Sequence, residues 1–443
     1  MIIEQFYDKG LAHASYAILS EGKMALVDPA RDPSIYYEFA KKHEAEIVAV
    51  FETHPHADFV SSHVEIAAET GATVYVSKLL GAEYDHTGFD EGDSIALGEL
   101  TLKAVNTPGH SPDSICIIAV DSEGNDHAVF TGDTLFVGDV GRPDLRESAG
   151  AIVAAREDLA RDMYRSTRTK LMTLNDDVLV YPAHGPGSLC GKNMSPDLFS
   201  TIGREVKENY ALQDMSEDEF VSILVADQPF VPKYFEYDVT TNKRGAEPVS
   251  AAIKAVTLLP VGSNLEPGVL VVDARKESDF KKGHNAGAIN IQNGGKFETW
   301  LGSIVGPDEP FYLVAASEDE LHVLIAKASK IGYEASIKAA VVNPSGMVET
   351  SRAFDRDAFD TDYNAFTIVD VRNPGEVASR TVFEGALNIP LPELRERAGE
   401  IPAGKPVVIH CAAGYRSAAG QSIVEAAMPD TEVLDLGMAI KEY

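Results

Sequence analysis

Residues 47–59 read Ile-Val-Ala-Val-Phe-Glu-Thr-His-Pro-His-Ala-Asp-Phe, so an apolar run leads directly into two histidines and an aspartate. The apolar part has the length and composition of a buried strand. Side chains that follow the carboxyl end of such a strand lie where α/β folds usually place their chemistry. Because imidazole and carboxylate are common ligands of zinc and iron, His54, His56 and Asp58 predict a metal site.

Three further segments place a histidine or an aspartate shortly after an apolar strand. They end in Thr-Pro-Gly-His110, Thr-Gly-Asp133 and Tyr-Pro-Ala-His184. Many histidines are ordinary core or surface residues, and that interpretation is kept for His13, His43, His63, His86, His127, His284 and His322. His110, Asp133 and His184 share the strand-end position of the first segment, so we predict that the four segments converge on one metal site.

These residues resemble the metallo-β-lactamase superfamily, whose signature His-x-His-x-Asp-His precedes a later histidine, a bridging aspartate and a last histidine. The resemblance implies an αββα sandwich as the fold of this part of the chain. The sequence departs from the signature at one position, because Phe59 stands where the last histidine of the signature is expected. A two-metal hydrolase uses that Asp-His pair to hold its second ion, so an apolar ring should weaken the second position.

Within the superfamily the sequence is most similar to the persulfide dioxygenases, which carry one Fe(II) held by two histidines and one aspartate. The segments that carry this likeness are residues 130–136, Gly141-Arg-Pro-Asp144 and residues 184–192. The resemblance implies one Fe(II) per chain with the ligands His54, His110 and Asp133, surrounded by His56, Asp58 and His184. Two imidazoles and one carboxylate leave positions open on the ion, where O2 and a persulfide sulfur can lie side by side.

Three residues of this region are candidate substrate contacts. Arg142 either pairs with a substrate carboxylate or forms a structural pair with Asp144. Lys192 is a weaker candidate for pairing with a substrate charge. Cys190 lies in a Ser-x-Cys-Gly-Lys segment similar to one in related fusion proteins, where it either takes up a sulfur atom or only packs. Cys116, inside the apolar run 115–120, is interpreted as a core residue.

The second half of the chain contains an internal repeat. Residues 269–275, Val-Leu-Val-Val-Asp-Ala-Arg, are echoed by Phe-Thr-Ile-Val-Asp-Val-Arg at 366–372, and Gly-Ala-Ile-Asn-Ile at 287–291 by Gly-Ala-Leu-Asn-Ile at 385–389. The two matches lie nearly in register, which implies two related domains of about 100 residues. Each copy alternates strands and helices after its first apolar strand, so we predict parallel sheets covered on both faces.

The second copy carries a candidate nucleophile. Residues 407–417, Val-Val-Ile-His-Cys-Ala-Ala-Gly-Tyr-Arg-Ser, place Cys411 between a buried strand and a helix that we expect to begin near Ser417. The N–H groups of such a loop and the helix N-terminus create positive potential, to which Arg416 adds. We therefore expect the thiol to ionise below its usual pKa of about 8.5 and to act as a nucleophile.

The loop around Cys411 and Arg416 resembles the active loop of rhodaneses, which are sulfurtransferases. A phosphatase loop of similar form is the alternative, but it is longer between its cysteine and its arginine. The first copy has no cysteine at the matching place, where Ala-Ala-Ser-Glu-Asp-Glu occupies residues 315–320. We expect that copy to be an inactive rhodanese-like domain that serves as a spacer, a docking surface or a dimer contact.

The whole sequence resembles the persulfide dioxygenase–rhodanese fusions. We expect a dioxygenase domain at residues 1–245, an inactive rhodanese-like domain at 246–350 and an active one at 351–443. The implied activity is oxidation of a low-molecular-weight thiol persulfide to sulfite, with sulfur transfer at Cys411 linking persulfide, sulfite and thiosulfate. Two alternatives remain, a two-metal thioester hydrolase of the glyoxalase II kind and a non-oxidative sulfur carrier.

Composition narrows the classes further. Only three of the 443 residues are cysteines, too few for a disulfide framework, which predicts a reducing and cytoplasmic location. The net charge of −31 argues against binding to nucleic acid or to anionic membranes. The sequence contains no apolar run of about 18 residues, so it predicts no membrane helix. Its first residues lack the pattern of a secretory signal. We expect a homo-oligomer, and we expect residues 220–248 to be a connecting segment.

Overall fold

The apolar runs of the first 200 residues form two six-stranded sheets within a first compact unit, Met1–Ala251 with Lys330–Gly332. The structure, a computed structural model, describes residues 1–145 and 155–443. The first sheet has the order β1 (Ile2–Asp8), β2 (His13–Ser20), β3 (Lys23–Val27), β4 (Glu46–Phe51), β5 (Thr73–Val76) and β6 (Thr87–Gly88). The second has the order β14 (Ser200–Thr201), β13 (Leu179–Pro182), β10 (Asp126–Gly132), β9 (Ile115–Val120), β8 (Leu100–Asn106) and β7 (Ser94–Leu97). A short ribbon of β11 (Leu135–Phe136) and β12 (Asp139–Val140) follows β10.

The two sheets pack face to face through large apolar side chains. Tyr16 and Phe51 of the first sheet share one buried cluster with Leu102, Ile117 and Phe130 of the second. Because side chains alternate between the two faces of a strand, the other residues of the same strands point to the outer faces. Those faces also need apolar cover, since strand β9 is buried along its whole length.

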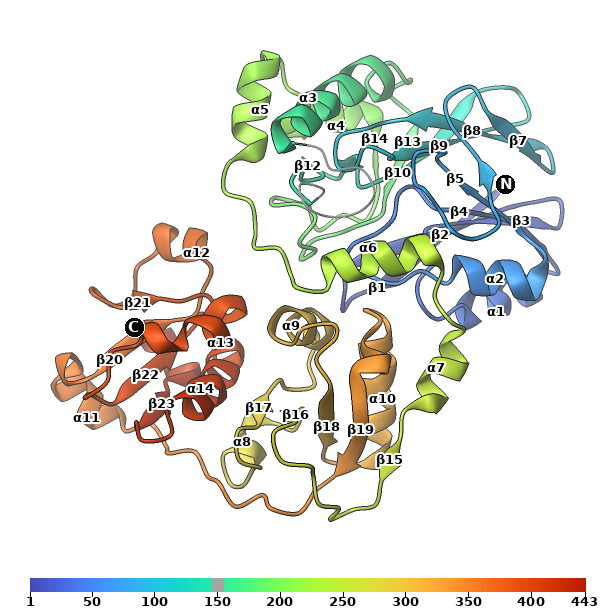
Figure 1. Cartoon of the computed structure of the whole chain (residues 1–443). Coiled ribbons are helices and arrows are strands. Elements are labelled where there is room, and N and C mark those ends of the chain that lie inside the picture. The colour runs from blue at the N-terminus through green and yellow to red at the C-terminus, as the bar shows by residue number, and fades with distance from the viewer. Residues whose placement is uncertain (146–154) are drawn as a thin grey trace. The chain divides into compact units, whose positions relative to one another are not determined.

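Helices provide that cover on both sides. The outer face of the first sheet packs against α1 (Ser34–Lys42) and α2 (His63–Thr70), through Tyr36 and Ile66. The outer face of the second packs against α3 (Arg156–Ser166) and α5 (Glu217–Val225), through Met163 and Phe220. Figure 1 shows α3, α4 (Ile202–Glu208) and α5 beside β13 and β14, and α1 and α2 beside β3 and β4. This layering confirms the expected αββα sandwich.

The expectation of a connecting segment at residues 220–248 was wrong, because this stretch contains most of α5 and all of α6 (Phe235–Arg244). Helix α5 is capped by Ser216, whose hydroxyl accepts the Glu219 N–H, and acidic side chains fill its first turn. The prolines at 229 and 232 occupy only the loop between the two helices. In the sequence these prolines favour a loop, and the apolar residues of α5 were therefore not interpreted as one face of a helix.

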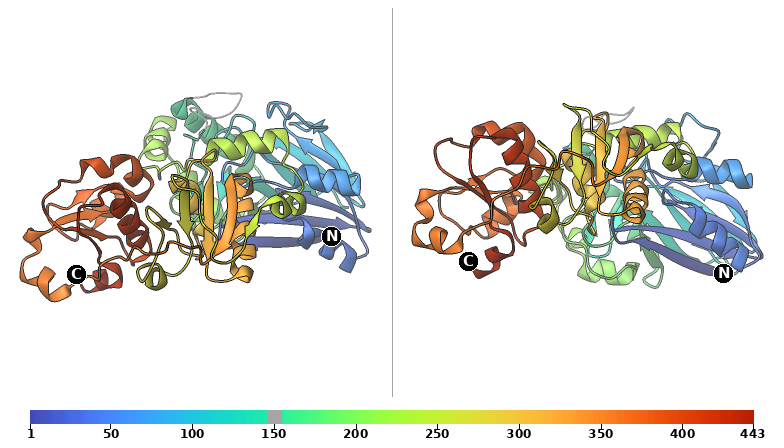
Figure 2. Two further views of the ribbon diagram at one scale, coloured as in Figure 1. Left: turned by 60° about the horizontal axis from the view of Figure 1, so that its bottom comes forward. Right: turned by 90° about the horizontal axis from the view of Figure 1, so that it is seen from below.

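The second unit, Ala252–Ser329 with Tyr333–Tyr443, contains two separate sheets in which every strand pair is parallel. The first has the order β15 (Leu258–Leu259), β19 (Ile337–Val342), β18 (Phe311–Ala315), β16 (Leu270–Asp273) and β17 (Ile289–Asn290). The second has the order β21 (Leu387–Asn388), β20 (Thr367–Asp370), β22 (Val407–His410) and β23 (Val433–Asp435). Helix α7 (Val249–Ala255) begins in the first unit and ends in the second. The longer helices of the second unit are α9 (Phe297–Ile304), α10 (Glu318–Ser329) and α14 (Tyr415–Ala427), and the shorter ones α8 (Glu277–Phe280), α11 (Arg356–Thr361), α12 (Pro374–Ser379) and α13 (Leu394–Arg397). In Figure 2 the yellow-to-orange and the orange-to-red sheets are seen from two directions.

The internal repeat extends to individual hydrogen bonds. Arg275 binds both carboxylate oxygens of Asp273, and Arg372 binds both of Asp370 in the same way. An asparagine of the neighbouring strand then donates to the two carbonyls that flank this turn, Asn290 in one sheet and Asn388 in the other. These matched bonds support two related domains, while the exact domain limits stay a prediction. Among the described residues, no helix combines the length and apolar character that a membrane span requires.

The Asp370–Arg372 pair is buried, so removing one partner should be costly. Asp370→Ala leaves the Arg372 guanidinium without its carboxylate, and we expect the second unit to lose about 3 kcal/mol of stability. Urea unfolding followed by the fluorescence of Trp300, the only tryptophan, measures this. The control is Asp370→Ala combined with Arg372→Met, which removes both charges and should recover part of the loss. Equal unfolding midpoints for the parent and Asp370→Ala would contradict the prediction.

Candidate metal centre

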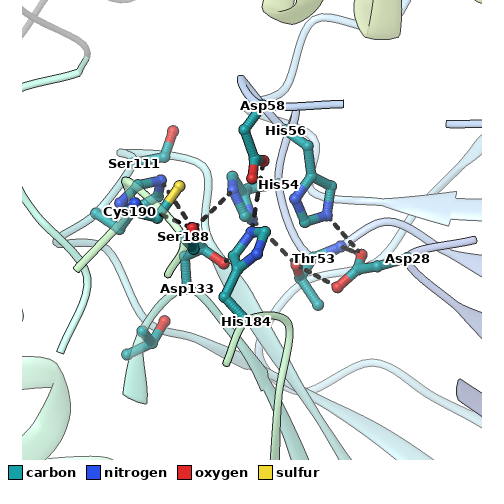
Figure 3. A network of polar contacts seen from close by, with 12 residues as sticks. Asp28, Thr53, His54, His56, Asp58, Ser111, Asp133, His184, Ser188 and Cys190 are labelled. Carbon is teal, nitrogen blue, oxygen red and sulfur yellow. Dashed lines mark hydrogen bonds and ion pairs between the residues drawn. The ribbon is translucent and has the colours of Figure 1, made fainter. Parts of the chain in front are cut away.

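The four predicted metal-binding segments meet at one end of the sandwich. His54 follows β4 of the first sheet, whereas His110, Asp133 and His184 follow β8, β10 and β13 of the second. Parallel pairing of β10 with β13 brings the last two segments side by side. All four side chains are buried. Figure 3 shows His54, Asp133 and His184 pointing toward one another from separate segments of the ribbon.

One glycine makes this approach possible. Gly132 directly precedes Asp133 and has a φ of +51°, a conformation that L side chains rarely adopt. A Cβ at this position would overlap the side chain of Thr53. The end of β10 can therefore lie directly against the loop after β4, which carries His54.

His54, His110 and Asp133 place their ligand atoms within 4.8 Å of one another. The Nε2 atoms of His54 and His110 lie 3.9 and 3.5 Å from Asp133 Oδ2. The other ring nitrogen of each histidine is engaged by the protein, because His54 Nδ1 lies 3.1 Å from Thr53 Oγ1 and His110 Nδ1 lies 2.9 Å from the carbonyl of Arg142. Partners of this kind orient an imidazole so that Nε2 is left for a metal.

The residues fit a divalent ion. Within the described residues, neither carboxylate oxygen of Asp133 makes a hydrogen bond, although the side chain is buried. A buried carboxylate needs a compensating charge or donors, and a cation between Asp133, His54 and His110 would supply that charge. Two nitrogen donors and one oxygen donor on one face are the set found in non-haem Fe(II) oxygenases.

His56, Asp58 and His184 surround this cluster. His56 Nε2 lies 3.1 Å from Asp28, which also accepts the N–H and the hydroxyl of Thr53, so Asp28 braces the loop from behind. His184 Nε2 lies 3.4 Å from an oxygen of Asp58 and 3.4 Å from an oxygen of Asp133.

The charges of His184, Asp58 and Asp133 depend on one another. Burial disfavours the charged form of His184, but the carboxylates of Asp133 and Asp58 outweigh burial and raise the pKa of His184 above its ordinary value. Burial would raise the pKa of Asp58, yet His184 next to it lowers that pKa to about 2. The two carboxylates therefore favour the protonated form of His184.

Phe59 lies inside the site, where its ring packs against other rings. The ring centroids of His13 and His56 lie 3.8 and 4.4 Å from that of Phe59. His13 is fully buried, and its Nε2 has no hydrogen-bond partner among the described residues. From the sequence alone His13 is interpreted as an ordinary core or surface residue, because its isolated position in a strand gives no signal of this contact.

Asn242 of α6 is a second residue that the sequence did not reveal. Its amide donates to the carbonyls of His56 and Phe59 and accepts the N–H of Ser61, all at 2.8 Å. This single buried side chain therefore holds the loop that contains His56, Asp58 and Phe59. It lies more than 180 residues from that loop in the sequence, which is why no local pattern could identify it.

The geometry favours structural roles for Arg142 and Lys192. Arg142 is 1% exposed, and its guanidinium donates to both oxygens of Asp144 and to the carbonyls of Leu189, Pro229 and Phe230. Because these bonds use all five of its N–H groups, none is left for a substrate carboxylate. Lys192 donates to the carbonyls of Leu224 and Ala226, where it caps the end of α5.

Cys190 lies beside the metal cluster. Its sulfur is within 4.8 Å of ligand atoms of Asp58 and His184, and the side chain is buried. Burial, followed by the carboxylates of Asp58 and Asp133, raises the pKa of the Cys190 thiol above its ordinary value. Cys116 faces the core, where it contacts Thr107 and the carbonyl of Thr131.

Cys411 directly follows β22 and is the only cysteine of the second unit. The Gly414 N–H donates to its sulfur at 3.2 Å, and Ser417 Oγ lies 3.7 Å away. Helix α14 begins at Tyr415, two residues before the expected start, because Gly414 adopts a left-handed conformation at its N-cap. The Arg416 guanidinium forms two bonds of 2.6 and 2.7 Å with Glu376, a partner that the sequence did not indicate.

Comparison with known proteins decides the family. Residues 8–184 match the model of the metallo-β-lactamase superfamily, and residues 355–440 match that of the rhodanese-like domain. A solved metallo-β-lactamase structure from Staphylococcus aureus aligns with a TM-score of 0.68 at 30% identity, covering 77% of this chain and 99% of that one. The chain belongs to the metallo-β-lactamase superfamily. It combines this domain with a C-terminal rhodanese-like domain, as the sequence analysis expected.

Two kinds of relative share the metallo-β-lactamase domain. The mitochondrial persulfide dioxygenase of Homo sapiens is 29% identical over 226 residues, which are 49% of this chain and 78% of that protein. A cytoplasmic hydroxyacylglutathione hydrolase of Arabidopsis thaliana is 33% identical over 174 residues, which are 38% of this chain and 62% of that protein. The likeness thus includes both an oxidative and a hydrolytic enzyme of this superfamily.

The clamp formed by Asn242 should matter for metal binding. Asn242→Ala removes three hydrogen bonds from residues 56–61 of the metallo-β-lactamase domain, and we expect metal affinity to fall by about tenfold or more. Competition with a chromophoric chelator measures the affinity. The control is Asn209→Ala, because Asn209 is equally buried and also bonds to backbone groups, but of other segments. An equal loss of affinity in the two variants would show that Asn242 acts only through general stability.

His63 should make the metallo-β-lactamase domain sensitive to acid. Burial and the neighbouring His56 lower the pKa of His63 to about 3 in the folded chain, below its unfolded value of about 6.5. The unfolded chain therefore binds more protons as the pH falls from about 6.5 to about 3, and stability decreases through this window. Between about pH 7 and pH 5 we expect a loss of about 2 kcal/mol from this residue.

Urea unfolding followed by circular dichroism tests this expectation. His63→Gln should make the stability less dependent on pH, whereas His127→Gln, at an exposed position of β10, should leave the pH dependence as it is. If His63→Gln retained the full pH dependence of the parent, another group would have to be responsible.

Proposed function

We propose that this chain is a persulfide dioxygenase with sulfurtransferase activity in its rhodanese-like domain. One observation carries the proposal: two oriented imidazoles and one buried carboxylate form a three-ligand face, and Phe59 takes the place of a ligand that two-metal hydrolases need. The likeness to a persulfide dioxygenase over the metallo-β-lactamase domain supports it. The substrate would be the persulfide of a low-molecular-weight thiol, and the product sulfite.

His54, His110 and Asp133 would hold one Fe(II), and the ion would supply the redox chemistry by which O2 oxidises the terminal sulfur of the persulfide. The carbonyl of Arg142 and the hydroxyl of Thr53 keep the two imidazoles oriented for this purpose. Burial of all three ligands limits the access of water, which protects a reactive sulfur from side reactions. In the overall reaction the terminal sulfur gains two oxygen atoms from O2 and one from water, and the thiol leaves.

Cys411 would carry a second sulfur reaction. The Gly414 N–H and the N-terminus of α14 face its sulfur, and both favour an anionic thiolate or persulfide. A Cys411 persulfide could transfer its outer sulfur to sulfite, which regenerates the thiolate and forms thiosulfate. Arg416 would attract the sulfite or thiosulfate oxygens, in competition with its partner Glu376.

The main alternative is a thioester hydrolase, because a hydroxyacylglutathione hydrolase also matches the metallo-β-lactamase domain. A hydrolase of that kind would use two metal ions to activate water. Metal content and oxygen consumption separate the two functions directly. We expect about one iron per active chain and oxygen uptake on addition of glutathione persulfide, without hydrolysis of a glutathione thioester.

Replacement of Cys411 tests whether the two centres act independently. Cys411→Ser should leave oxygen uptake with free persulfide largely intact and abolish sulfur transfer from thiosulfate, because serine is not a sulfur acceptor. His110→Ala should abolish oxygen uptake and leave sulfur transfer from thiosulfate largely intact. Loss of both activities in a folded Cys411→Ser protein would contradict independent centres, and hydrolysis without oxygen uptake in the parent would contradict the proposed function.

A further inference from the structure

Three residues from the first copy of the repeat belong to the first compact unit and not to the second. Lys330–Gly332 form the turn that follows α10, yet they group with Met1–Ala251. Ile331, at the centre of this 330–332 turn, is fully buried. Turns usually run over the surface, where water satisfies their backbone groups. A buried turn therefore indicates a specific contact.

The backbone of the 330–332 turn holds the loop that carries Phe59. The N–H of Val60, the residue after Phe59, donates to the Lys330 carbonyl at 2.8 Å. Val60 is fully buried, so water cannot replace this carbonyl as the acceptor. Asn242 of α6 donates to the Phe59 carbonyl in the same loop. Two partners that lie far away in the sequence therefore hold adjacent peptide groups of this loop.

The side chain of Lys330 reaches a second turn of the first unit. Its ammonium lies 2.6 Å from Oδ2 of Asp8, at the end of β1. The other carboxylate oxygen of Asp8 accepts the N–H groups of Gly10 and Leu11, so it fixes the turn between β1 and β2. Burial would raise the pKa of Asp8, but the Lys330 ammonium outweighs burial and lowers that pKa. The ion pair thus favours the anionic form of Asp8, which accepts these bonds.

The turn between β1 and β2 leads directly into the candidate metal centre. The carbonyl of Ala12 lies 3.2 Å from Nδ1 of His184, and the ring of His13 packs on Phe59. Ala12 has a φ of +56°, a backbone conformation that persists only where the surrounding structure supports it. Lys330 supports both sides of this contact, because its carbonyl holds the loop of Phe59 and its ammonium holds the turn before His13.

Gly332 allows the 330–332 turn to approach this closely. Its φ is +67°, and a Cβ at this position would lie 2.7 Å from Cε1 of Tyr237 and 3.3 Å from Cγ2 of Val60. Tyr237 lies on α6, and its hydroxyl donates to the Gly332 carbonyl at 3.3 Å. A side chain at position 332 would be strained in its backbone and would also push the turn away from α6.

We propose that the 330–332 turn positions the candidate metal centre, so that the first copy of the repeat serves the metallo-β-lactamase domain. Lys330 and Gly332 would act indirectly, through the loops that carry Phe59 and His13. Support of this kind matters because a ligand set binds metal tightly only while the residues around it are held in place. Loss of such support typically lowers metal affinity by about ten- to a hundredfold.

This inference concerns metal binding and holds whichever reaction the centre supports; only its effect on oxygen uptake rests on the proposed function. The test therefore measures the affinity for Co²⁺ by competition with a chromophoric chelator, together with the visible spectrum of the bound ion. That spectrum depends on the geometry of the ligands, which a change in general stability would leave as it is. The full-length chain carries Cys411→Ser, so that the thiol of the rhodanese-like domain does not bind cobalt.

Gly332→Ala should lower the Co²⁺ affinity by about tenfold or more and shift the visible spectrum, because the turn can no longer hold the loop of Phe59. The matched control is Gly287→Ala in the same copy of the repeat. Gly287 has a nearly equal φ of +69°, but a Cβ there would meet no atom of the described residues within 4 Å. This control adds the same backbone strain without the contact, and it should retain the affinity and spectrum of the parent.

Lys330→Met provides a second variant, which covers a Gly332→Ala chain that does not fold. It keeps the carbonyl that binds Val60 and removes the ammonium that binds Asp8, so we expect a smaller loss of Co²⁺ affinity. Lys330→Arg should restore the affinity. Lys338→Met, which removes an exposed ion pair with Glu266 in the same copy, should bind Co²⁺ as the parent does.

Three results would overturn the inference: the affinity and spectrum of the parent in a folded Gly332→Ala chain, the affinity of the parent in Lys330→Met, or equal losses in Gly332→Ala and Gly287→Ala. Oxygen uptake of the iron-loaded chains should fall in the same order as the Co²⁺ affinities. Absence of oxygen uptake in the parent would instead refute the proposed function, while the differences in Co²⁺ affinity would still support the role of the turn.

Discussion

The buried carboxylate of Asp133 is the group on which the site depends. Its two oxygens face different partners, with His54 and His110 near one and His184 near the other. A carboxylate without hydrogen bonds in an apolar interior is costly, so the surrounding positive or metal-binding groups are needed to keep it there. The fold brings them to it by joining the ends of β4, β8, β10 and β13, strands that belong to two different sheets.

Because Asp133 needs these partners at fixed positions, many neighbouring side chains serve to orient the candidate metal ligands. Arg142 uses its whole guanidinium on Asp144 and three carbonyls, and its own carbonyl faces His110. Asp28 and Asn242 brace the loop that follows β4 from opposite ends. Residues that look like candidate substrate contacts in a sequence can therefore serve the metal site through the backbone, because a ligand set is useful only while its geometry is held.

In the second unit, the two sheets share a pattern of hydrogen bonds and differ in their reactive groups. Both sheets contain the Asp-x-Arg pair and the asparagine that bonds across it, and in each the asparagine satisfies backbone carbonyls at this turn. The copies differ at the loop that follows β18 in the first sheet and β22 in the second. Cys411 accepts a backbone N–H in one, whereas in the other the Glu320 carboxylate accepts the Ala316 N–H and the amide of Asn293. A fixed negative charge in that place would repel an anionic sulfur compound, which is consistent with an inactive copy.

The sequence by itself determined which candidate reactive residues follow predicted strands. These are His54, His110, Asp133 and His184 after apolar runs, the repeated Asp-x-Arg, and the loop of Cys411. These features are local, because a strand, a turn and the residue after it are neighbours in the chain. Only the tertiary structure decided that Asn242 holds the loop of His56, that Glu376 binds Arg416, that helices occupy residues 220–248, and that Cys190 lies beside Asp58. Each of these relations joins positions far apart in the chain or depends on packing. Long-range contacts and packing leave no periodic or spacing signal in the sequence.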